Sequence, residues 1–153
     1  MLANVYGPGP KSSSTDRGIL NQMIRKAMKG QNLTLYGKGD QMRDYIFVED
    51  VIEAFLAAAV KKREIDGRSF LLASGIGTTL SEAFHLVARR VQIKVGQLVD
   101  VQSVEPPEES SSVDSRHFVG NINAIRSSLK WEPKHPLLEG IDRTIDYFLG
   151  ETK

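Results

Sequence analysis

The chain has 153 residues, of which 41% are hydrophobic and 25% are charged, a composition typical of a globular protein with an ordinary core. Its net charge of +1 gives no electrostatic argument for a nucleic-acid-binding surface, and the absence of cysteine excludes disulfides, thiolate nucleophiles and cysteine-ligated zinc. The sequence contains neither an apolar run long enough to cross a bilayer nor a signal peptide, so we expect a cytoplasmic protein.

Short apolar segments and glycine-rich breaks alternate in the first third of the chain. Residues 2–6 predict a strand that ends at the glycines and prolines of 7–10. Residues 17–28 have the spacing of an amphipathic helix, and residues 33–36 alternate like a strand. A second glycine-rich turn follows at 37–40.

The next segment predicts a short strand at 45–48 and then a helix. Asp50 is a favourable N-cap residue with Glu53 three positions later, so we expect the helix to begin there. The apolar positions of this helix predict a single buried stripe, formed by Val51, Ile52, Phe55, Leu56, Ala59 and Val60.

The second half of the chain continues the alternation of strands and helices. Strands are expected at 69–73 and 98–104, separated by a helix that opens with a capping box between Thr79 and Glu82. The proline, acidic and serine residues of 105–115 predict a mobile loop, and helices are expected at 122–129 and 137–149. The fold class is therefore α/β, built from mixed short strands and helices.

The sequence contains no complete nucleotide-binding loop, metal site or catalytic group. The Gly-x-Gly pairs at 7/9, 37/39 and 75/77 all lack the third glycine of a dinucleotide fingerprint, although the last pair lies between a strand and a helix. The three histidines are too scattered for a metal site. We therefore predict no catalytic and no metal-binding residue.

Arg43 is the most specific candidate binding residue. It follows a strand and a glycine-rich turn and precedes a short strand and a helix. Its guanidinium group is suited to bidentate recognition of phosphate. The residues alone also allow a structural interpretation, in which Arg43 forms a surface ion pair with Asp44 or Glu49.

Two segments carry a family resemblance, NVYGP at 4–8 and GKGDQMRDYIFVEDV at 37–51. Together with Arg116 and the LKWEP segment at 129–133, they resemble the C-terminal portion of the extended short-chain dehydrogenase/reductases, a Rossmann-type fold. More narrowly, the chain is similar to the NAD-dependent nucleotide-sugar epimerases and dehydratases, over nearly its whole length.

The resemblance implies roles for individual residues. Asn4, Arg43 and Arg116 would bind the substrate, a nucleotide-diphosphate sugar, with Arg43 at the diphosphate and Arg116 at a phosphate or the nucleoside ribose. The turn Tyr6, Gly7 and Pro8 would lie beside the nicotinamide end of NAD. The sequence departs from the family at Leu71, His117, Asn121 and Lys130, and these departures leave the nucleotide base undefined.

The family's catalytic groups are not found in this sequence. The glycine-rich NAD loop is absent, and none of the four tyrosines has a lysine four residues later. Residues 1–153 are therefore expected to form a single substrate-binding domain, without the N-terminal NAD-binding Rossmann domain. In the intact enzyme, which the family resemblance allows to be a homodimer, NAD would oxidise the sugar at C4 to a 4-keto intermediate.

We expect the chain itself to be inactive and not to bind NAD tightly. Its expected partners are the nucleotide sugar and the missing NAD-binding domain, with neither nucleic acid nor membrane. An alternative from another class remains open, a non-catalytic binding or interaction module that keeps the fold without the chemistry.

Overall fold

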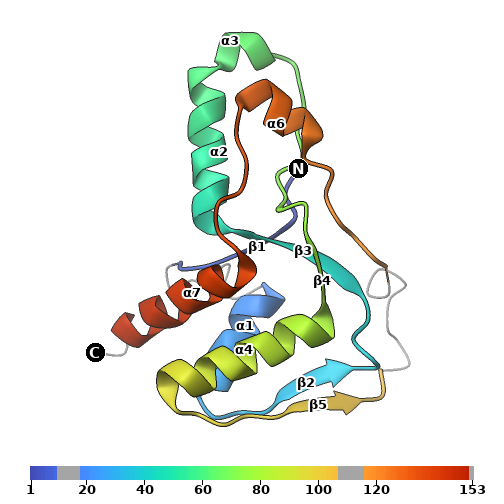
Figure 1. Cartoon of the computed structure of the whole chain (residues 1–153), viewed down its shortest axis with the longest axis vertical. Coiled ribbons are helices and arrows are strands. Elements are labelled where there is room, and N and C mark those ends of the chain that lie inside the picture. Colours follow the sequence, from blue (N-terminus) through green and yellow to red (C-terminus); the bar gives the residue numbers. More distant parts are fainter. Residues whose placement is uncertain (10–17, 107–115, 152–153) are drawn as a thin grey trace.

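The computed structural model describes residues 1–9, 18–106 and 116–151 (Figure 1). Most of the predicted mobile loop at 105–115 lies outside the described residues. None of the described helices is long and apolar enough to span a membrane. The elements follow in the order β1 (Asn4–Tyr6), α1 (Ile19–Met28), β2 (Leu33–Tyr36), β3 (Met42–Phe47), α2 (Val48–Val60), α3 (Lys62–Ile65), β4 (Gly77–Thr79), α4 (Leu80–Val95), β5 (Val101–Val104), α6 (Asn123–Leu129) and α7 (Leu137–Glu151).

The strands form two small sheets. In the first, β3 lies between β1, which it pairs in parallel, and β4, which it pairs antiparallel. In the second, β2 pairs in parallel with β5, at the lower end of the molecule in Figure 1. The predicted strand at 69–73 is wrong, because only Leu72 forms a bridge, to Leu2. The predicted strand at 98–104 is shortened to β5, which begins at Val101.

Strand β3 separates two hydrophobic cores, because successive side chains of a strand point to opposite faces. Tyr45 and Phe47 belong to the larger core, together with buried residues of α1, α4 and α7. Ile46 belongs to the smaller core, together with residues of α2 and α6 and with Trp131. Both faces of β3 are therefore covered, which is the usual environment of a strand in a parallel sheet.

Helix α2 differs from the sequence prediction at its start and in its buried face. The helix begins at Val48, not at Asp50, and its N-cap residue Phe47 makes no side-chain cap bond. Asp50 is fully buried and instead accepts hydrogen bonds from the backbone N–H groups of Lys134 and His135, at 2.9 and 3.2 Å. Its carboxylate therefore connects α2, through these hydrogen bonds, to the segment that precedes α7.

The buried face of α2 is formed by small residues. Of the predicted stripe only Val51 is buried, whereas Ile52, Phe55, Leu56, Ala59 and Val60 are exposed. Ala54 is buried, and Ala57 and Ala58 are half-buried beside the smaller core. Small side chains let a helix approach its neighbours closely. The buried face of α2 consequently lies on the opposite side of the helix from Ile52, Phe55, Leu56 and Val60.

Helices α4 and α7 confirm the sequence predictions more closely. The capping box of α4 is present, with Thr79 accepting from the Glu82 backbone and the Glu82 carboxylate accepting from Thr79. These hydrogen bonds hold the pKa of Glu82 below its usual range. Arg90 and Lys94 of α4 form ion pairs with Asp142 and Asp146 of α7, at 2.6 and 2.7 Å. The ion pairs align α4 and α7 along the larger core.

Candidate functional site

Asn4, Tyr6 and Arg43 lie on one face of the β1–β3 pair. In the parallel register Asn4 is opposite Tyr45 and Tyr6 is opposite Phe47, and residues opposite each other share a face. Arg43, Tyr45 and Phe47 alternate along β3 and therefore share that face too. The Tyr6 and Phe47 rings confirm this arrangement, with centroids 5.6 Å apart. Because it carries two of the residues predicted to bind the substrate, Asn4 and Arg43, we call this the binding face of β3, although Tyr45 and Phe47 on it are buried in the larger core.

The structure brings Arg43 and Arg116 together, although they are 73 residues apart in the sequence. The Nη1 atom of Arg43 donates to two backbone carbonyl oxygens, that of Met42 at 3.0 Å and that of Arg116. Phe118 donates its backbone N–H to the Met42 carbonyl at 3.1 Å. The segment at 116–118 thus runs beside the start of β3, and the Arg116 side chain is exposed there.

The two carboxylates considered as ion-pair partners of Arg43 have other hydrogen bonds. Asp44 points to the opposite face, where its carboxylate accepts from Ser74 N and Oγ, both at 2.7 Å, from Gly75 N at 2.9 Å and from Gly120 N at 3.0 Å. Glu49 accepts from Arg143 at 2.7 Å. We call Asp44 with Ser74, Gly75 and Gly120 the Asp44 cluster. It joins β3 to two distant segments.

The predicted cofactor-side turn is held rigidly by other elements. Gly7 exchanges two hydrogen bonds with the side chain of Asn21 in α1, at 3.1 and 3.0 Å. The Tyr6 hydroxyl donates to the Leu137 carbonyl at 3.2 Å. Gly7 has a φ of +136°, and a Cβ there would lie 2.6 Å from Val48 Cγ1, so the position requires glycine. Four residues along β3, at about 3.3 Å each, separate this turn from Arg43 by roughly 13 Å.

Burial shifts the ionisation of both tyrosines on the binding face. Burial is the main reason that the pKa of Tyr6 lies well above its usual value, with Asp50 and Glu139 raising it further. Burial also raises the pKa of Tyr45 to about 12, against the opposing effect of Arg43. Neither phenol is suited to proton transfer near neutral pH. The Tyr45 hydroxyl is buried without a hydrogen-bond partner among the described residues, as is Oε1 of Gln41.

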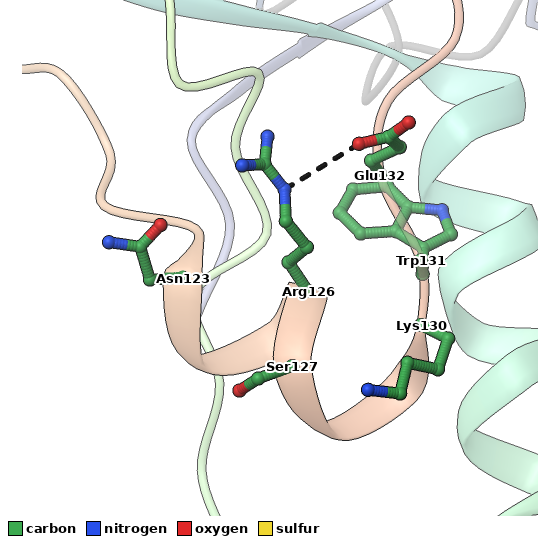
Figure 2. Close-up of a pocket in the computed structure, with 6 residues that line it drawn as sticks. All are labelled: Asn123, Arg126, Ser127, Lys130, Trp131 and Glu132. Atoms are coloured by element: carbon green, nitrogen blue, oxygen red, sulfur yellow. Dashed lines mark ion pairs between the residues drawn. The ribbon is translucent and has the colours of Figure 1, made fainter.

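Two open cavities lie away from the binding face. The larger, of about 610 Å³, is lined by Asn123, Arg126, Ser127, Lys130, Trp131 and Glu132, and Figure 2 shows Arg126 paired with Glu132 at 3.5 Å. The smaller, of about 400 Å³, lies beside the Asp44 cluster and includes Gly75. Neither contains a predicted substrate-binding residue. Within the described ranges, no group of three His, Asp or Glu side chains is arranged to hold a metal ion.

Three of the departures from the family pattern have visible structural roles. The His117 ring accepts the Met42 backbone N–H through Nδ1, at 3.3 Å. Asn121 accepts from the Asn123 backbone at the start of α6, at 3.0 Å. Lys130 ends α6 in the left-handed conformation, with a φ of +54°, which is a position that favours glycine. His117 and Asn121 therefore stabilise the local backbone through hydrogen bonds, whereas Lys130 adopts a conformation that is unfavourable for a lysine.

Sequence reasoning missed the Asp44 cluster and the role of Asn21. The sequence presents Asp44 as a neighbour and possible ion-pair partner of Arg43, although alternation along a strand places neighbours on opposite faces. That alternation is the signal that could have found the cluster. For Asn21 the sequence holds no comparable signal, because its partner Gly7 lies 14 residues away across residues of no regular pattern.

The fold defines the class of protein. The chain has the fold of the C-terminal portion of an extended short-chain dehydrogenase/reductase. Over 99% of its length it superimposes, with a TM-score of 0.81 and 28% identity, on 45% of the UDP-glucose 4-epimerase of Thermotoga maritima, solved with UDP-glucose. The UDP-glucose 4-epimerase of Thermus thermophilus, solved with NAD, matches with a TM-score of 0.73 and 29% identity, over 97% of this chain and 45% of that one.

Sequence comparison names the family. The profile of the NAD dependent epimerase/dehydratase family matches residues 1–73. A UDP-glucose 4-epimerase of Mycolicibacterium smegmatis is 29% identical over 151 residues, which are 99% of this chain and 45% of that protein. The chain is therefore similar to members of the NAD dependent epimerase/dehydratase family over nearly its whole length. It spans about 45% of the length of these relatives.

Proposed function

We propose that this chain is the nucleotide-sugar-binding part of an NAD-dependent epimerase or dehydratase, and that Asn4, Arg43 and Arg116 bind the substrate. The observation that carries the proposal is the contact between Arg43 and the backbone of Arg116, on the face that also carries Asn4. The Arg43 guanidinium there contacts the backbone of a second arginine from a distant segment, in a protein whose net charge is only +1.

The geometry around Arg43 suits a diphosphate. Two carbonyl oxygens hold Nη1 and so orient the guanidinium plane, which reduces the entropy lost when a ligand binds. Each charge-assisted contact to a phosphate contributes roughly 1.5–3 kcal/mol. The Asn4 side chain, which donates to the Asp44 carbonyl at 3.0 Å, lies beside the path from Arg43 to the Tyr6–Gly7 turn. It is placed to contact the sugar or the diphosphate.

We propose that NAD is held mainly outside the described residues. The hydrogen-bonding groups of the predicted cofactor-side turn have partners already, because Asn21 binds both the N–H and the carbonyl of Gly7, and Tyr6 binds Leu137. The turn can therefore contact a nicotinamide only through van der Waals interactions. We propose that a separate dinucleotide-binding half, corresponding to the part of the relatives that this chain does not match, holds NAD.

In that assembly this chain would bind and orient the sugar nucleotide for a reaction at C4 that passes through a 4-keto sugar. The high pKa of Tyr6 and Tyr45 and the absence of a lysine four residues after any tyrosine argue against proton transfer by this chain. We therefore propose that the isolated chain is inactive, and that its contribution to catalysis is binding energy and orientation.

Binding of UDP-glucose by titration calorimetry tests the proposal directly. We expect the chain to bind UDP-glucose or UDP and to bind NAD far more weakly, with dTDP- and CDP-glucose showing which base is preferred. Turnover should appear only when the remaining half of a relative, such as the M. smegmatis epimerase, is added. A chain that binds none of these nucleotides, or that binds NAD as tightly as a sugar nucleotide, contradicts the proposal. Binding without turnover in the presence of the added half would favour a non-catalytic module.

A further inference from the structure

The larger of the two cavities lies against one side of helix α6. Its polar wall is formed by residues spaced three or four apart, which therefore share one side of the helix, namely Asn123, Arg126, Ser127 and Lys130. Trp131 and Glu132, which follow the helix, face this wall (Figure 2). A volume of about 610 Å³ is in the size range of small-molecule sites, and we call this space the α6 cavity.

Lys130 has a backbone conformation that a lysine rarely adopts. It ends α6 with φ and ψ of +54° and +36°, and it is the only non-glycine residue with a positive φ in the part of the chain that the structure describes. Strained backbone of this kind clusters at ligand-binding and active sites. No described residue pairs with the Lys130 ammonium group, which is exposed at the edge of the α6 cavity. The strain therefore places a cation beside this cavity without forming any contact within the chain.

Arg126 supplies a second cation on the same side of α6. It pairs with Glu132 only through Nε, at 3.5 Å, and Figure 2 shows both terminal nitrogens of the guanidinium group turned away from that carboxylate. The two side chains are 54% and 67% exposed, so the ion pair contributes little to stability and can open for a ligand. Lys61 brings a third positive charge to the neighbouring side of α6, where it donates to the Ser128 carbonyl at 3.4 Å. Positive charge therefore exceeds negative charge around the α6 cavity.

We propose that the α6 cavity binds a small organic phosphate, whose phosphate group lies between Arg126 and Lys130. A guanidinium fork and an ammonium group are the side chains best suited to hold a phosphate. The Asn123 amide adds two N–H donors on the same side of the helix. Trp131 forms an apolar wall for the rest of the ligand, because Figure 2 shows its six-membered ring toward Arg126 and its nitrogen toward α2. This site is separate from the binding face of β3, and the proposal does not rest on nucleotide-sugar binding there.

The fluorescence of Trp131 tests the proposal, because Trp131 is the only tryptophan of the chain and lines the cavity. Titration with inorganic phosphate, glucose 1-phosphate and UMP at constant ionic strength should change this fluorescence to a plateau, whereas glucose should not. The larger response to glucose 1-phosphate or to UMP distinguishes a sugar phosphate from a nucleotide as the ligand. Arg43→Ala should leave the response unchanged. A response that is absent, that glucose reproduces or that disappears in Arg43→Ala overturns the proposal.

Substitutions of the cations and of the carboxylate should change the affinity in opposite directions. Arg126→Ala should raise the dissociation constant of the bound phosphate at least about tenfold, and Glu132→Gln should lower it, because the carboxylate competes for Arg126. Lys130→Gly should also weaken binding at least about tenfold.

Lys130→Gly has a second readout, which a merely structural lysine would not combine with the first. Its melting temperature should rise by about 2–4 °C, because glycine adopts the left-handed conformation without strain. Lys62→Ala, at an exposed lysine of α3 outside the cavity, is the matched control and should change neither quantity. Unchanged affinity in Lys130→Gly overturns the proposal, as does an equal loss of affinity in the Lys62→Ala control.

Discussion

The polar groups on the two faces of β3 differ in how completely they are hydrogen-bonded within the chain. On one face Asp44 is fully buried, and its carboxylate accepts four hydrogen bonds, all from within the chain. On the other, Arg43 is half-buried and the Tyr45 hydroxyl has no partner among the described residues. A buried polar group that is fully bonded stabilises a fold, whereas a buried polar group without a partner beside a half-buried cation is typical of a binding site. The comparison separates a face that stabilises the fold from the face that we propose binds the substrate.

The largest effect should come from Asp44→Ala. This change removes the acceptor of three backbone N–H groups and one hydroxyl in a buried cluster, so we expect it to lower the free energy of unfolding by roughly 3–5 kcal/mol. Urea denaturation measures the loss. Asp100→Ala provides the control, because Asp100 is exposed and lies just before β5 in the other sheet. A loss no larger than that of the control would mean that the Asp44 cluster does not support the fold.

Arg43→Ala should weaken ligand binding and leave the stability of the fold nearly unchanged. We expect UDP-glucose binding to weaken by roughly 1.5–3 kcal/mol, about ten- to a hundredfold, while the melting temperature changes little. Arg43→Lys should recover only part of the affinity, because an ammonium group lacks the guanidinium fork. Arg89→Ala, at an exposed arginine of α4, is the matched control in calorimetry. If Arg43→Ala lowers stability and leaves binding intact, the binding face is structural after all.

Ser74→Ala measures how much one hydrogen-bond donor of the Asp44 cluster contributes to the free energy of unfolding. The hydroxyl donates to the Asp44 carboxylate at 2.7 Å and accepts the Ile76 backbone N–H at 3.1 Å. The free energy of unfolding should fall by about 1.5 kcal/mol, since a hydrogen bond to a charged group is stronger than a neutral one. A double-mutant cycle with Asp44→Ala should show strong coupling. Additive losses would indicate that the hydroxyl acts elsewhere.

Tyr45→Phe should raise stability by roughly 1 kcal/mol, because it removes a buried hydroxyl that has no partner among the described residues. The substitution also has a pH signature. The folded pKa of Tyr45, about 12, lies above its usual value of 10.0, so the fold loses stability as the pH rises from the lower value through the higher one. Denaturation at alkaline pH should show a smaller loss in Tyr45→Phe than in the wild type.

Local signals in the sequence predicted local features of the fold. Thr79 and Glu82 are three residues apart and form the expected capping box, because both partners lie within one helical turn. The alternation at 33–36 likewise predicts β2 with its buried and exposed residues in order. Features that depend on partners far away in the chain could not be predicted from the sequence. Asp50 has the sequence of an N-cap, but the Lys134 and His135 backbone groups, 84 and 85 residues away, are its partners.

The buried stripe of α2 was wrong for a physical reason that applies more widely. Hydrophobic periodicity weights large side chains, which pointed to the face with Phe55 and Leu56. The helix instead buries Ala54, because close contact with the strands requires small side chains. For the candidate site, the sequence singled out Arg43 and Arg116 through their family resemblance. Only the structure shows that they meet, because no sequence signal links positions 73 residues apart.

The Asp44 cluster also has a consequence for the order of folding events. Its hydrogen bonds close loops of 30 residues, to Ser74, and of 76 residues, to Gly120. Closing such loops has an entropic cost that rises with their length, so contacts between distant segments tend to form late. Changes at contacts absent from the folding transition state act on the unfolding rate. We therefore expect loss of the Asp44 carboxylate mainly to accelerate unfolding, shortening the lifetime of the native chain without slowing its formation.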